Sequence, residues 1–426
     1  MPTPEAPAAP CPSWREMWTA FGRIGVLSFG GPAAQIAVMH RELVDRRGWL
    51  TEPRFADALA FCMLLPGPEA MQLATYCGWR MRGTAGGLLA GLLFVVPGAL
   101  VIFALAAVYV AHGDVPLVAA AFLGVKAAVV AIIAQAVAKI AARAIKGAAS
   151  RMIAAAAFAA MLLGAPFPLI VLGAALAGAL RRPGAARTAE PPARPSTLRT
   201  VALWGAIWAA PLLALWAAGA DRLWQIGAFF SMLAVVTFGG AYAVLAWMAQ
   251  AAVETQGWLT PAQMADALGL AETTPGPLIL VTQFVGILAA LPGGQGAAFL
   301  GGLVALHATF APCFLWIFAG APWIDVLTAR PRIAGALAGV SAAVVGVIAH
   351  LGLWFATHLL FARQAVLPFG SARIEVPVPA SVDPAALALA ALSAALLLWR
   401  HWPLPVVLAA AAGAGVALSL AGAPSA

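Results

Sequence analysis

Long uncharged apolar runs constrain this chain most. They are continuous and rich in Ala, Leu, Gly and Val, without the period-two alternation of a membrane β-barrel. Each reaches the roughly 20 residues that a helix needs to cross a bilayer core. We therefore expect an all-α polytopic membrane protein with ten or more hydrophobic segments, not all of which cross fully. The runs are 88–111, 152–180, 201–220, 223–253, 333–362 and 402–420.

Composition supports this class and excludes others. Hydrophobic residues make up 63% of the chain and charged residues only 9%, against about 25% charged in soluble domains. The net charge of +8 comes from arginines between the apolar runs, which is typical of cytoplasmic loops rather than of a nucleic-acid-binding face. The four cysteines are scattered, so we expect no disulfide framework, no metal site and no cofactor.

The chain is built from an internal repeat. At an offset of 209 residues, Phe29-Gly30-Gly31 matches Phe238-Gly239-Gly240 and Pro66-Gly67-Pro68 matches Pro275-Gly276-Pro277. At an offset of 215, residues 124–130 match residues 339–345. The predicted domains are a disordered N-terminal tail (1–12), a first transporter repeat (13–180), an Arg- and Pro-rich cytoplasmic linker (181–200), a second repeat (201–362), and a C-terminal loop with hydrophobic helices (363–426).

Arginine placement predicts that the two repeats are inverted in the membrane. The loop at 39–54 has four arginines, whereas the equivalent loop at 248–263 has none. Conversely, Arg330 and Arg332 precede the second-half helix, and the matching first-half stretch has no basic residue. Since Lys and Arg mark the cytoplasmic side, equivalent loops lie on opposite sides.

The two Pro-Gly-Pro motifs interrupt apolar runs that otherwise read as helix, because proline removes a backbone donor and clashes with the preceding turn. A new helix starting after Pro68 points free N–H groups forward, and such an end suits an anion. Two such ends, facing each other near mid-membrane, would cradle a small oxyanion. The alternative is that both motifs only kink packed helices.

Several polar residues near the breaks are candidates for the site. Gln72 and Gln283 can donate to an anion or bond to a neighbouring helix, and Glu69 is a candidate proton carrier. Lys126, whose repeat partner is Ser341, supplies a cation to the site or snorkels to the interface as an anchor. The equivalent residues Asp57 and Asp266 lie on helices that lead into the breaks. We interpret this pair as structural, with proton conduction as the alternative. Further polar residues near the breaks are Thr75, Tyr76, Glu272, Thr273 and Thr282.

These motifs resemble the chromate ion transporter family in its long form with two homologous halves. The resemblance covers about residues 14–362 and has little support in 152–180 and 384–420. It implies a bacterial inner-membrane protein that exports chromate, driven by the proton gradient, and confers chromate resistance. Many relatives have a His where Gln35 stands and a second Gln where Met71 stands. The motifs are 28–32 (SFGGP), 65–70 (LPGPEA), 72–76 (QLATY), 237–240 (TFGG), 271–277 (AETTPGP), 283–286 (QFVG) and 312–316 (PCFLW).

The predicted function is therefore chromate transport, with protons as the coupling ion and the lipid bilayer as surroundings. The alternatives are a carrier of sulfate or another oxyanion, an integral-membrane enzyme, for which the six dispersed histidines offer no clustered site, and a structural membrane subunit. Nucleic acid is not an expected partner, and a homodimer stays open. The candidate substrate-binding residues are Ser28, Phe29, Gly30, Gly31, Gln35, Pro66, Gly67, Pro68, Glu69, Gln72, Lys126, Thr237, Gly239, Gly240, Thr274, Pro275, Gly276, Pro277 and Gln283.

Overall fold

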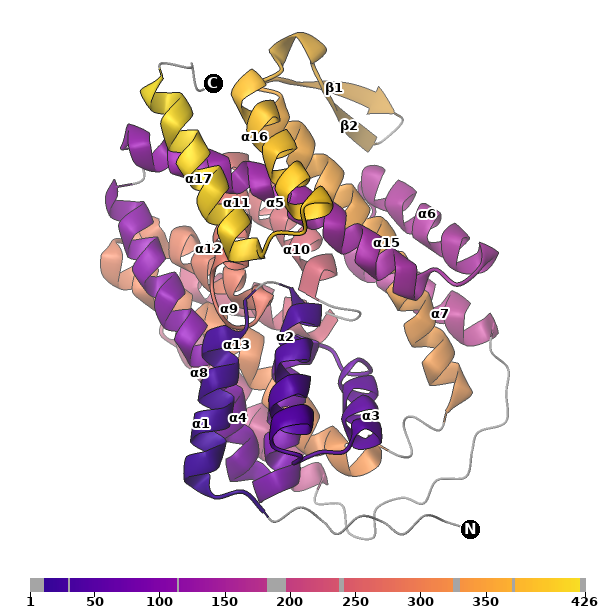
Figure 1. Ribbon diagram of the computed structural model, residues 1–426. Coiled ribbons are helices and arrows are strands. Elements are labelled where there is room, and N and C mark those ends of the chain that lie inside the picture. The colour runs from indigo at the N-terminus through magenta and orange to yellow at the C-terminus, as the bar shows by residue number, and fades with distance from the viewer. Residues whose placement is uncertain are drawn as a thin grey trace.

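The computed structural model describes residues 11–29, 31–112, 115–181, 197–236, 241–324, 330–369 and 372–421, and helices make up most of them (Figure 1). Most of the predicted N-terminal tail and linker, together with Gly30, Thr237, Gly239 and Gly240, lie outside the described residues.

The first half contains seven helices and one π-helical turn among its described residues. Two prolines sit at helix starts, Pro32 in α2 and Pro116 in α5, where a missing N–H costs nothing. The elements are α1 (Trp14–Leu27), α2 (Pro32–His40), η1 (Arg41–Arg46), α3 (Glu52–Cys62), α4 (Glu69–His112), α5 (Pro116–Ala144), α6 (Ala148–Leu162) and α7 (Phe167–Arg181).

The second half repeats this order after one extra helix, α8 (Thr197–Ala217). A short antiparallel hairpin, in which Val366 pairs with Glu375, precedes the last two helices. The elements that follow α8 are α9 (Asp221–Val236), α10 (Ala241–Gln250), η2 (Ala251–Thr255), α11 (Pro261–Thr273), α12 (Val281–Ala290), α13 (Gln295–Gly320), α15 (Pro331–Leu360), β1 (Gln364–Phe369), β2 (Ala372–Pro377), α16 (Pro384–Ala394) and α17 (Leu404–Leu420).

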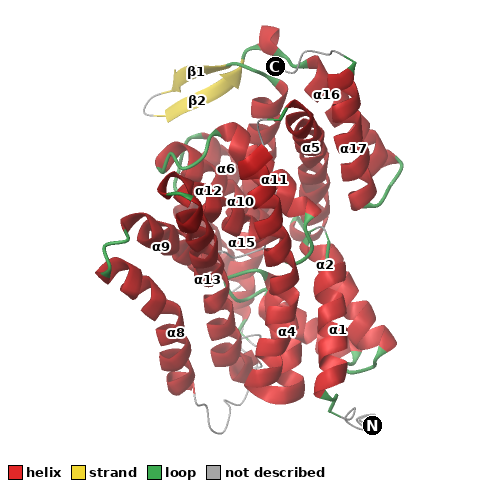
Figure 2. Cartoon of the chain, turned by 90° about the vertical axis from the view of Figure 1, so that its left-hand side faces the viewer, coloured by secondary structure: helices red, strands yellow, loops and turns green. Residues whose placement is uncertain are grey.

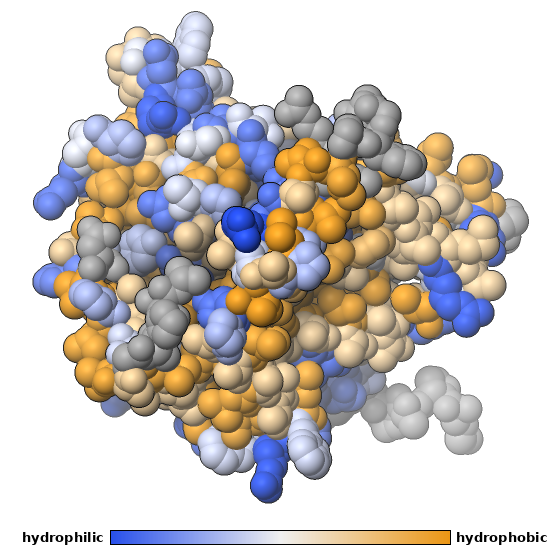
Figure 3. Space-filling model, turned by 90° about the horizontal axis from the view of Figure 1, so that it is seen from above, coloured by the Kyte–Doolittle hydropathy of each residue, from blue (hydrophilic) through white to orange (hydrophobic). Residues whose placement is uncertain are grey.

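Within the described ranges, five helices are long and apolar enough to cross a membrane: α4, α5, α8, α13 with its 3-10 extension to Trp323, and α15. The other apolar helices are shorter. The five long apolar helices, together with the high helix content, confirm the expected all-α polytopic class. Apolar side chains also cover much of the outer surface when the molecule is seen from above (Figure 3). Such a surface suits lipid rather than water.

Helix α4 is two helices joined at a sharp bend. Gly83, with φ of 61°, follows Arg82 at the bend, so the chain reverses there. The backbone of Gly78 then packs closely on that of Gly86. In the second half, α12 and α13 form the same hairpin, with Gly286 packed on Gly301. Glycine allows this close approach because it has no side chain in the way.

Equivalent helices run in opposite directions, which supports the predicted inversion. Ile133 of α5 lies against Gly352 of α15, and Ala127 lies in one cluster with Leu360. Residue numbers therefore increase along α5 in the direction in which they decrease along α15, so the two helices are antiparallel. Helix α4 and helix α13 are related in the same way, because Phe103 contacts Gly302 whereas Gly87 contacts Phe318.

Short helical hairpins pack crosswise between the halves. The hairpin α6 and α7 of the first half lies along α15 of the second, whereas α16 and α17 of the second half lie along α5 of the first (Figures 1 and 2). Gly339 of α15 meets the backbone of Ala174, and its repeat partner Gly124 of α5 meets that of Ala411.

The apolar run 152–180 is thus two short helices rather than one span. The start of its second helix, Pro166-Phe167-Pro168, matches the start of α17, Pro403-Leu404-Pro405, at an offset of 237 residues. The hairpins α6–α7 and α16–α17 therefore take equivalent places in the two halves. The domain boundaries stay a prediction.

Candidate functional site

Both Pro-Gly-Pro breaks have glycines in the left-handed region. Gly67 has φ of 120° and Gly276 has φ of 87°, conformations that other residues rarely adopt. Each break rests on the long helix of the other half. A methyl group on Gly67 would lie 3.0 Å from Cys313 Sγ of α13, and one on Gly276 would lie 3.0 Å from the Phe94 carbonyl oxygen of α4.

The segment after α1 holds the second-half break in place. The amide of Gly276 donates to the carbonyl of Ser28 at 2.8 Å, and Gln35 Nε2 donates to the carbonyl of Gly276 at 2.8 Å. Gln35 is buried and belongs to α2. This polar clamp therefore ties the N-terminal helices of the first half to the break of the second.

The glutamines that follow the breaks bind backbone carbonyls. Gln72 Nε2 donates to the Pro66 carbonyl at 2.6 Å, and Gln283 Nε2 donates to the Ala99 carbonyl of α4 at 3.0 Å. Both side chains are fully buried. The geometry agrees with the alternative of structural glutamines, Gln72 closing its own break and Gln283 joining a neighbouring helix.

Lys126 is ion-paired rather than free. Its Nζ lies 3.1 Å from Oδ1 of Asp266, and Tyr109 donates its hydroxyl to Oδ2 of the same carboxylate at 2.9 Å. The three residues join α5, α11 and α4. Lys126 thus shares its charge with Asp266 of the other half, and its role as a cation of the substrate site stays a prediction.

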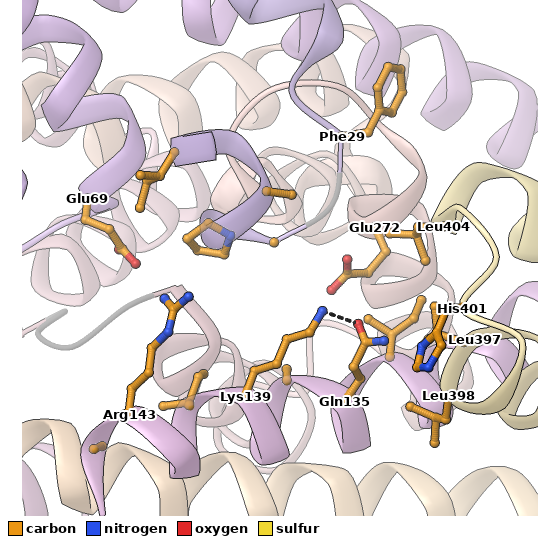
Figure 4. Close-up of a pocket in the computed structure, with 18 of the residues that line it drawn as sticks. Phe29, Glu69, Gln135, Lys139, Arg143, Glu272, Leu397, Leu398, His401 and Leu404 are labelled. Carbon is orange, nitrogen blue, oxygen red and sulfur yellow. Dashed lines mark hydrogen bonds between the residues drawn. The ribbon is translucent and has the colours of Figure 1, made fainter. Parts of the chain in front are cut away.

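A cavity of about 830 Å³ lies beside the last turns of α5 (Figure 4). Its lining comes from α2, α3, the first residue of α4, α11, α15 and the segment that joins α16 to α17. Of the predicted site residues, Phe29, Gly31 and Glu69 line it.

Four charged side chains face this cavity from three helices. Glu69 of α4 and Arg143 of α5 point toward each other, and Glu272 of α11 lies near Lys139 of α5 (Figure 4). Lys139 Nζ donates to Oε1 of Gln135 at 2.7 Å. Oε2 of Glu69 is buried and has no hydrogen-bond partner among the described residues.

Sequence reasoning missed the two cations and only noted Glu272. Lys139 and Arg143 lie four residues apart near the end of an apolar helix, where basic residues usually mark the membrane interface. Glu272 stands three residues before Pro275, close to the break. The available signal was the spacing of Lys139 and Arg143, which places both on one helix face.

Of the two helix starts expected to face each other, one lines the cavity in this structure. Helix α4 begins at Glu69, which lines the cavity. In the second half, a buried 3-10 turn (Leu278–Leu280) follows Pro277, and α12 begins at Val281, which is buried as well. Thr274 is buried and donates to the Ala271 carbonyl at 3.2 Å. Packing of this break against α4 keeps its free amides away from the cavity.

The equivalent positions of the second half line a much smaller space. Beside α15 lies a void of about 10 Å³, the size of one water, lined by Gln250, Glu254, His350, Leu351 and Trp354 among others. The last three match Gln135, Ala136 and Lys139 of the large cavity at the offset of 215. The two halves therefore enclose very different volumes beside their equivalent helices α5 and α15.

Metal ligands do not gather in the part of the chain that the structure describes. No group of three or more His, Cys, Asp or Glu side chains there could hold a metal ion. The charged groups of the cavity are two carboxylates and two basic side chains, with His401 also on its lining. This set can bind an anion and exchange protons.

Comparisons with known proteins agree on one family. A family model described as "Chromate transporter" matches residues 15–179 and 224–416. The chain is similar to the chromate transport proteins of Pseudomonas aeruginosa (35% identity, 80% of this chain and 81% of the relative) and Cupriavidus metallidurans (32%, 80% and 82%). It is also similar to a probable chromate transport protein of Synechococcus elongatus (30%, 80% and 84%).

No solved structure matches this chain significantly. The family match includes α6, α7 and α16 and most of α17, which the motif-based resemblance left out. The crosswise hairpins therefore lie within the family's shared region. Their low content of polar motif residues explains why motif reasoning did not find them.

Proposed function

The chain belongs to the chromate transporter family, and from this premise we propose that it is a secondary active transporter that exports chromate, is coupled to the proton gradient and confers chromate resistance. The family and the apolar helices make it a multi-pass membrane protein, in bacteria of the inner membrane. Its relatives are named transport proteins, which favours a transporter over an enzyme.

One observation carries the proposal. A cavity of about 830 Å³ with two basic side chains and two carboxylates on its lining lies beside α5, whereas the equivalent positions of α15 line a void of only about 10 Å³. Inverted repeats that adopt different states around a buried site are the structural basis of alternating access. Exchange of the two states between the halves would move the ion from one side of the membrane to the other.

Charge distribution supports outward transport. The segment joining α2 to α3 carries Arg41, Arg46 and Arg47, which marks the cytoplasmic side. Helix α3 lies at that end of the molecule (Figure 1) and lends Leu59 to the cavity lining. The cavity wall thus includes an element next to the predicted cytoplasmic loop, the side from which an exported ion would be loaded.

Proton coupling is assigned to Glu69. Its carboxylate begins α4, faces the cavity and has one oxygen that is buried without a partner among the described residues. A carboxylate repels an anion beside it, and protonation removes that repulsion. Sulfate, which is also a tetrahedral dianion, is the second candidate substrate, because nothing in this charge arrangement distinguishes the two ions.

The test is transport by purified protein in liposomes. We expect uptake of radiolabelled chromate when a pH gradient is imposed, and competition by unlabelled sulfate. Empty liposomes and a gradient collapsed by a protonophore are the controls. A preparation shown to be folded that moves neither ion would reject the transporter proposal, and flux unaffected by the gradient would reject proton coupling.

A further inference from the structure

We propose that His358 is a proton-binding site at the extracytoplasmic end of α15, and that its protonated imidazole latches the β1–β2 hairpin in place by binding Glu375. The latch holds the small space beside α15 shut when the outer solution is acidic and loosens as the pH rises. Its effect on transport rests on the proposed function, whereas the latch itself does not. The latch senses outer protons and does not require a proton and the transported anion to bind together.

The hairpin has no counterpart in the first half. Helices α5 and α6 are joined by residues 145–147, whereas α15 and α16 are joined by residues 361–383, which contain both strands. Across this connection the offset between the repeats rises from 215 to 237 residues. The insertion directly follows the part of α15 that matches the cavity-lining end of α5. An added element therefore sits beside the small space of the second half.

The course of α15 places the hairpin on the extracytoplasmic side. Arg330 and Arg332 mark the start of this helix as cytoplasmic, and the helix is long enough to cross the membrane. The hairpin lies at the end of the molecule away from α1 (Figures 1 and 2). The side chain of Glu375 in β2 is 43% exposed, so protons of the outer solution reach its ion pair with His358.

The contacts of His358 are satisfied together when both ring nitrogens carry a hydrogen. Its Nδ1 lies 2.8 Å from the carbonyl oxygen of Trp354, which only accepts, so Nδ1 is a donor. Its Nε2 lies 3.2 Å from Oε2 of Glu375. In a neutral ring with hydrogen on Nδ1, the lone pair of Nε2 would meet the negative carboxylate. A second proton on the ring turns this contact into an ion pair.

Two carboxylates and a second imidazole surround the latch. Glu254 of η2 is close enough to interact electrostatically with both His358 and Glu375. The two carboxylates repel each other, and a positive charge on His358 offsets that repulsion. His350 lies two turns earlier on α15 and lines the small space. Asp383, at the end of the hairpin segment, accepts from the first amides of α16 and caps that helix.

Trp354 connects the latch to the small space beside α15. The rings of Trp354 and His358 have centroids 4.4 Å apart and planes inclined by 31°, and Trp354 lines the small space together with Glu254. At the equivalent positions the first half has Lys139 and Arg143, which line the large cavity. A hairpin that binds His358 therefore also holds Trp354 in the wall of the small space.

The other contacts of the hairpin do not depend on a proton. At its base the amide of Asp383 donates to the carbonyl of Leu360 at 2.8 Å, and Gln364 donates to a backbone carbonyl of α15 at 2.9 Å. Of these contacts, only the pair of His358 with Glu375 changes with side-chain protonation near neutral pH. Protonation and closure strengthen each other by the same factor, up to about tenfold per pH unit for one proton.

The experiment measures the position of the hairpin by electron paramagnetic resonance between two spin labels. The labels are attached to Val366→Cys in β1 and Gln256→Cys after η2, both exposed positions, in full-length protein with Cys11→Ser to remove the exposed native thiol. The distance distribution is recorded between about pH 5 and pH 8, where histidine titrates. We expect two populations, with the ratio of the latched to the released one falling by up to about tenfold per pH unit as the pH rises.

Variants identify the proton site. His358→Gln and Glu375→Gln should each remove most of the pH dependence of the distance. His358→Arg introduces the residue type of its repeat partner Arg143, which stays charged, and should keep the hairpin latched up to about pH 8. His112→Gln is the matched control, because His112 is an exposed histidine at the end of α4. It should behave like the unaltered protein.

Two outcomes would overturn the inference: one distance distribution at every pH in the unaltered protein, or an unchanged pH dependence in His358→Gln. Size-exclusion profiles and helical circular dichroism must first show that each variant is folded. Chromate flux in liposomes is measured in parallel. Absence of flux with a hairpin that still moves with pH would reject the proposed function and leave the latch standing. Normal flux with a hairpin that does not respond to pH would reject the latch alone.

Discussion

Lys126 of the first half forms a 3.1 Å ion pair with Asp266 of the second, inside the helix assembly. The Lys126 side chain is only 17% exposed and that of Asp266 9%. Loss of one partner leaves a buried charge uncompensated, which costs about 3–5 kcal/mol. We predict that Lys126→Met lowers the melting temperature in detergent and that Lys126→Met with Asp266→Leu restores much of it. A folded double variant without chromate transport would show that the pair is functional rather than structural.

Substitution of Gly276 tests whether the second-half break requires a glycine in the left-handed region. A side chain there meets an unfavourable φ of 87° and the Phe94 carbonyl, so Gly276→Ala should cost about 1–3 kcal/mol of folding stability. Gly173→Ala in α7 is the control, because a methyl group at that position has open space around it. Thermal unfolding followed by tryptophan fluorescence measures both. Equal melting temperatures would show that the break adapts to a side chain.

Substitution of Gln35 tests the hydrogen bond by which α2 of the first half holds the break of the second half. Gln35→Leu removes the donor to the Gly276 carbonyl and leaves a buried acceptor unsatisfied, at about 1–3 kcal/mol. Gln35→His keeps a donor, and we expect it to retain more stability and transport than Gln35→Leu. The measurement is the melting temperature together with chromate flux in liposomes. Identical behaviour of the two variants would show that the donor is not needed.

The interaction of His40 with Glu52 should make the folding stability of the protein depend on pH. It lies outside the long apolar helices, and its Nε2 is 2.6 Å from Oε2 of Glu52. The hydrogen bond to Glu52 raises the pKa of His40, burial opposes the rise in part, and Asp45 adds to it.

Because the pKa of His40 is higher in the folded state, its contribution to stability is full below the ordinary value of about 6.5 and is lost as pH rises through the raised pKa. The melting temperature of the unaltered protein should therefore fall more between pH 6 and pH 8 than that of Glu52→Gln. Parallel curves would exclude this pair as a source of the pH dependence.

Glu69 tests proton coupling directly. Glu69→Gln mimics the protonated carboxyl group, so the variant should still bind the anion but lose most of the response to an imposed pH gradient. Chromate flux with and without the gradient gives the ratio to compare with the unaltered protein. The control is Glu16→Gln, because Glu16 is an exposed residue of α1 that does not line the cavity. A Glu69→Gln protein with full, still proton-dependent transport would contradict the assignment.

Sequence reasoning predicted the architecture well because its signals are local or repeated. Pro66-Gly67-Pro68 and its partner identified the breaks, and counts of arginine in matched loops predicted the inversion. The antiparallel course of α5 and α15 supports the latter. A proline in an apolar run has few structural options, so these predictions needed no knowledge of packing.

The site was harder to predict. Its charged groups come from α4, α5 and α11, and only the packed structure brings Glu69, Glu272 and Arg143 to one space. Lys126 looked like the cation of the site because its partner Asp266 is 140 positions away in the sequence. The sizes of the two spaces beside α5 and α15 follow from side-chain packing, and no residue pattern specifies them.

The crosswise packing of the short hairpins also makes the two halves depend on each other. The close approach of α17 to α5 at Gly124 leaves no room there for a side chain larger than hydrogen. The segment before α17 and its first turn also bring His401 and Leu404 to the cavity lining. Helix α5 of the first half thus takes both a packing partner and part of its neighbouring cavity wall from beyond residue 362, so a substitution in α17 reaches a compartment that it does not itself enclose.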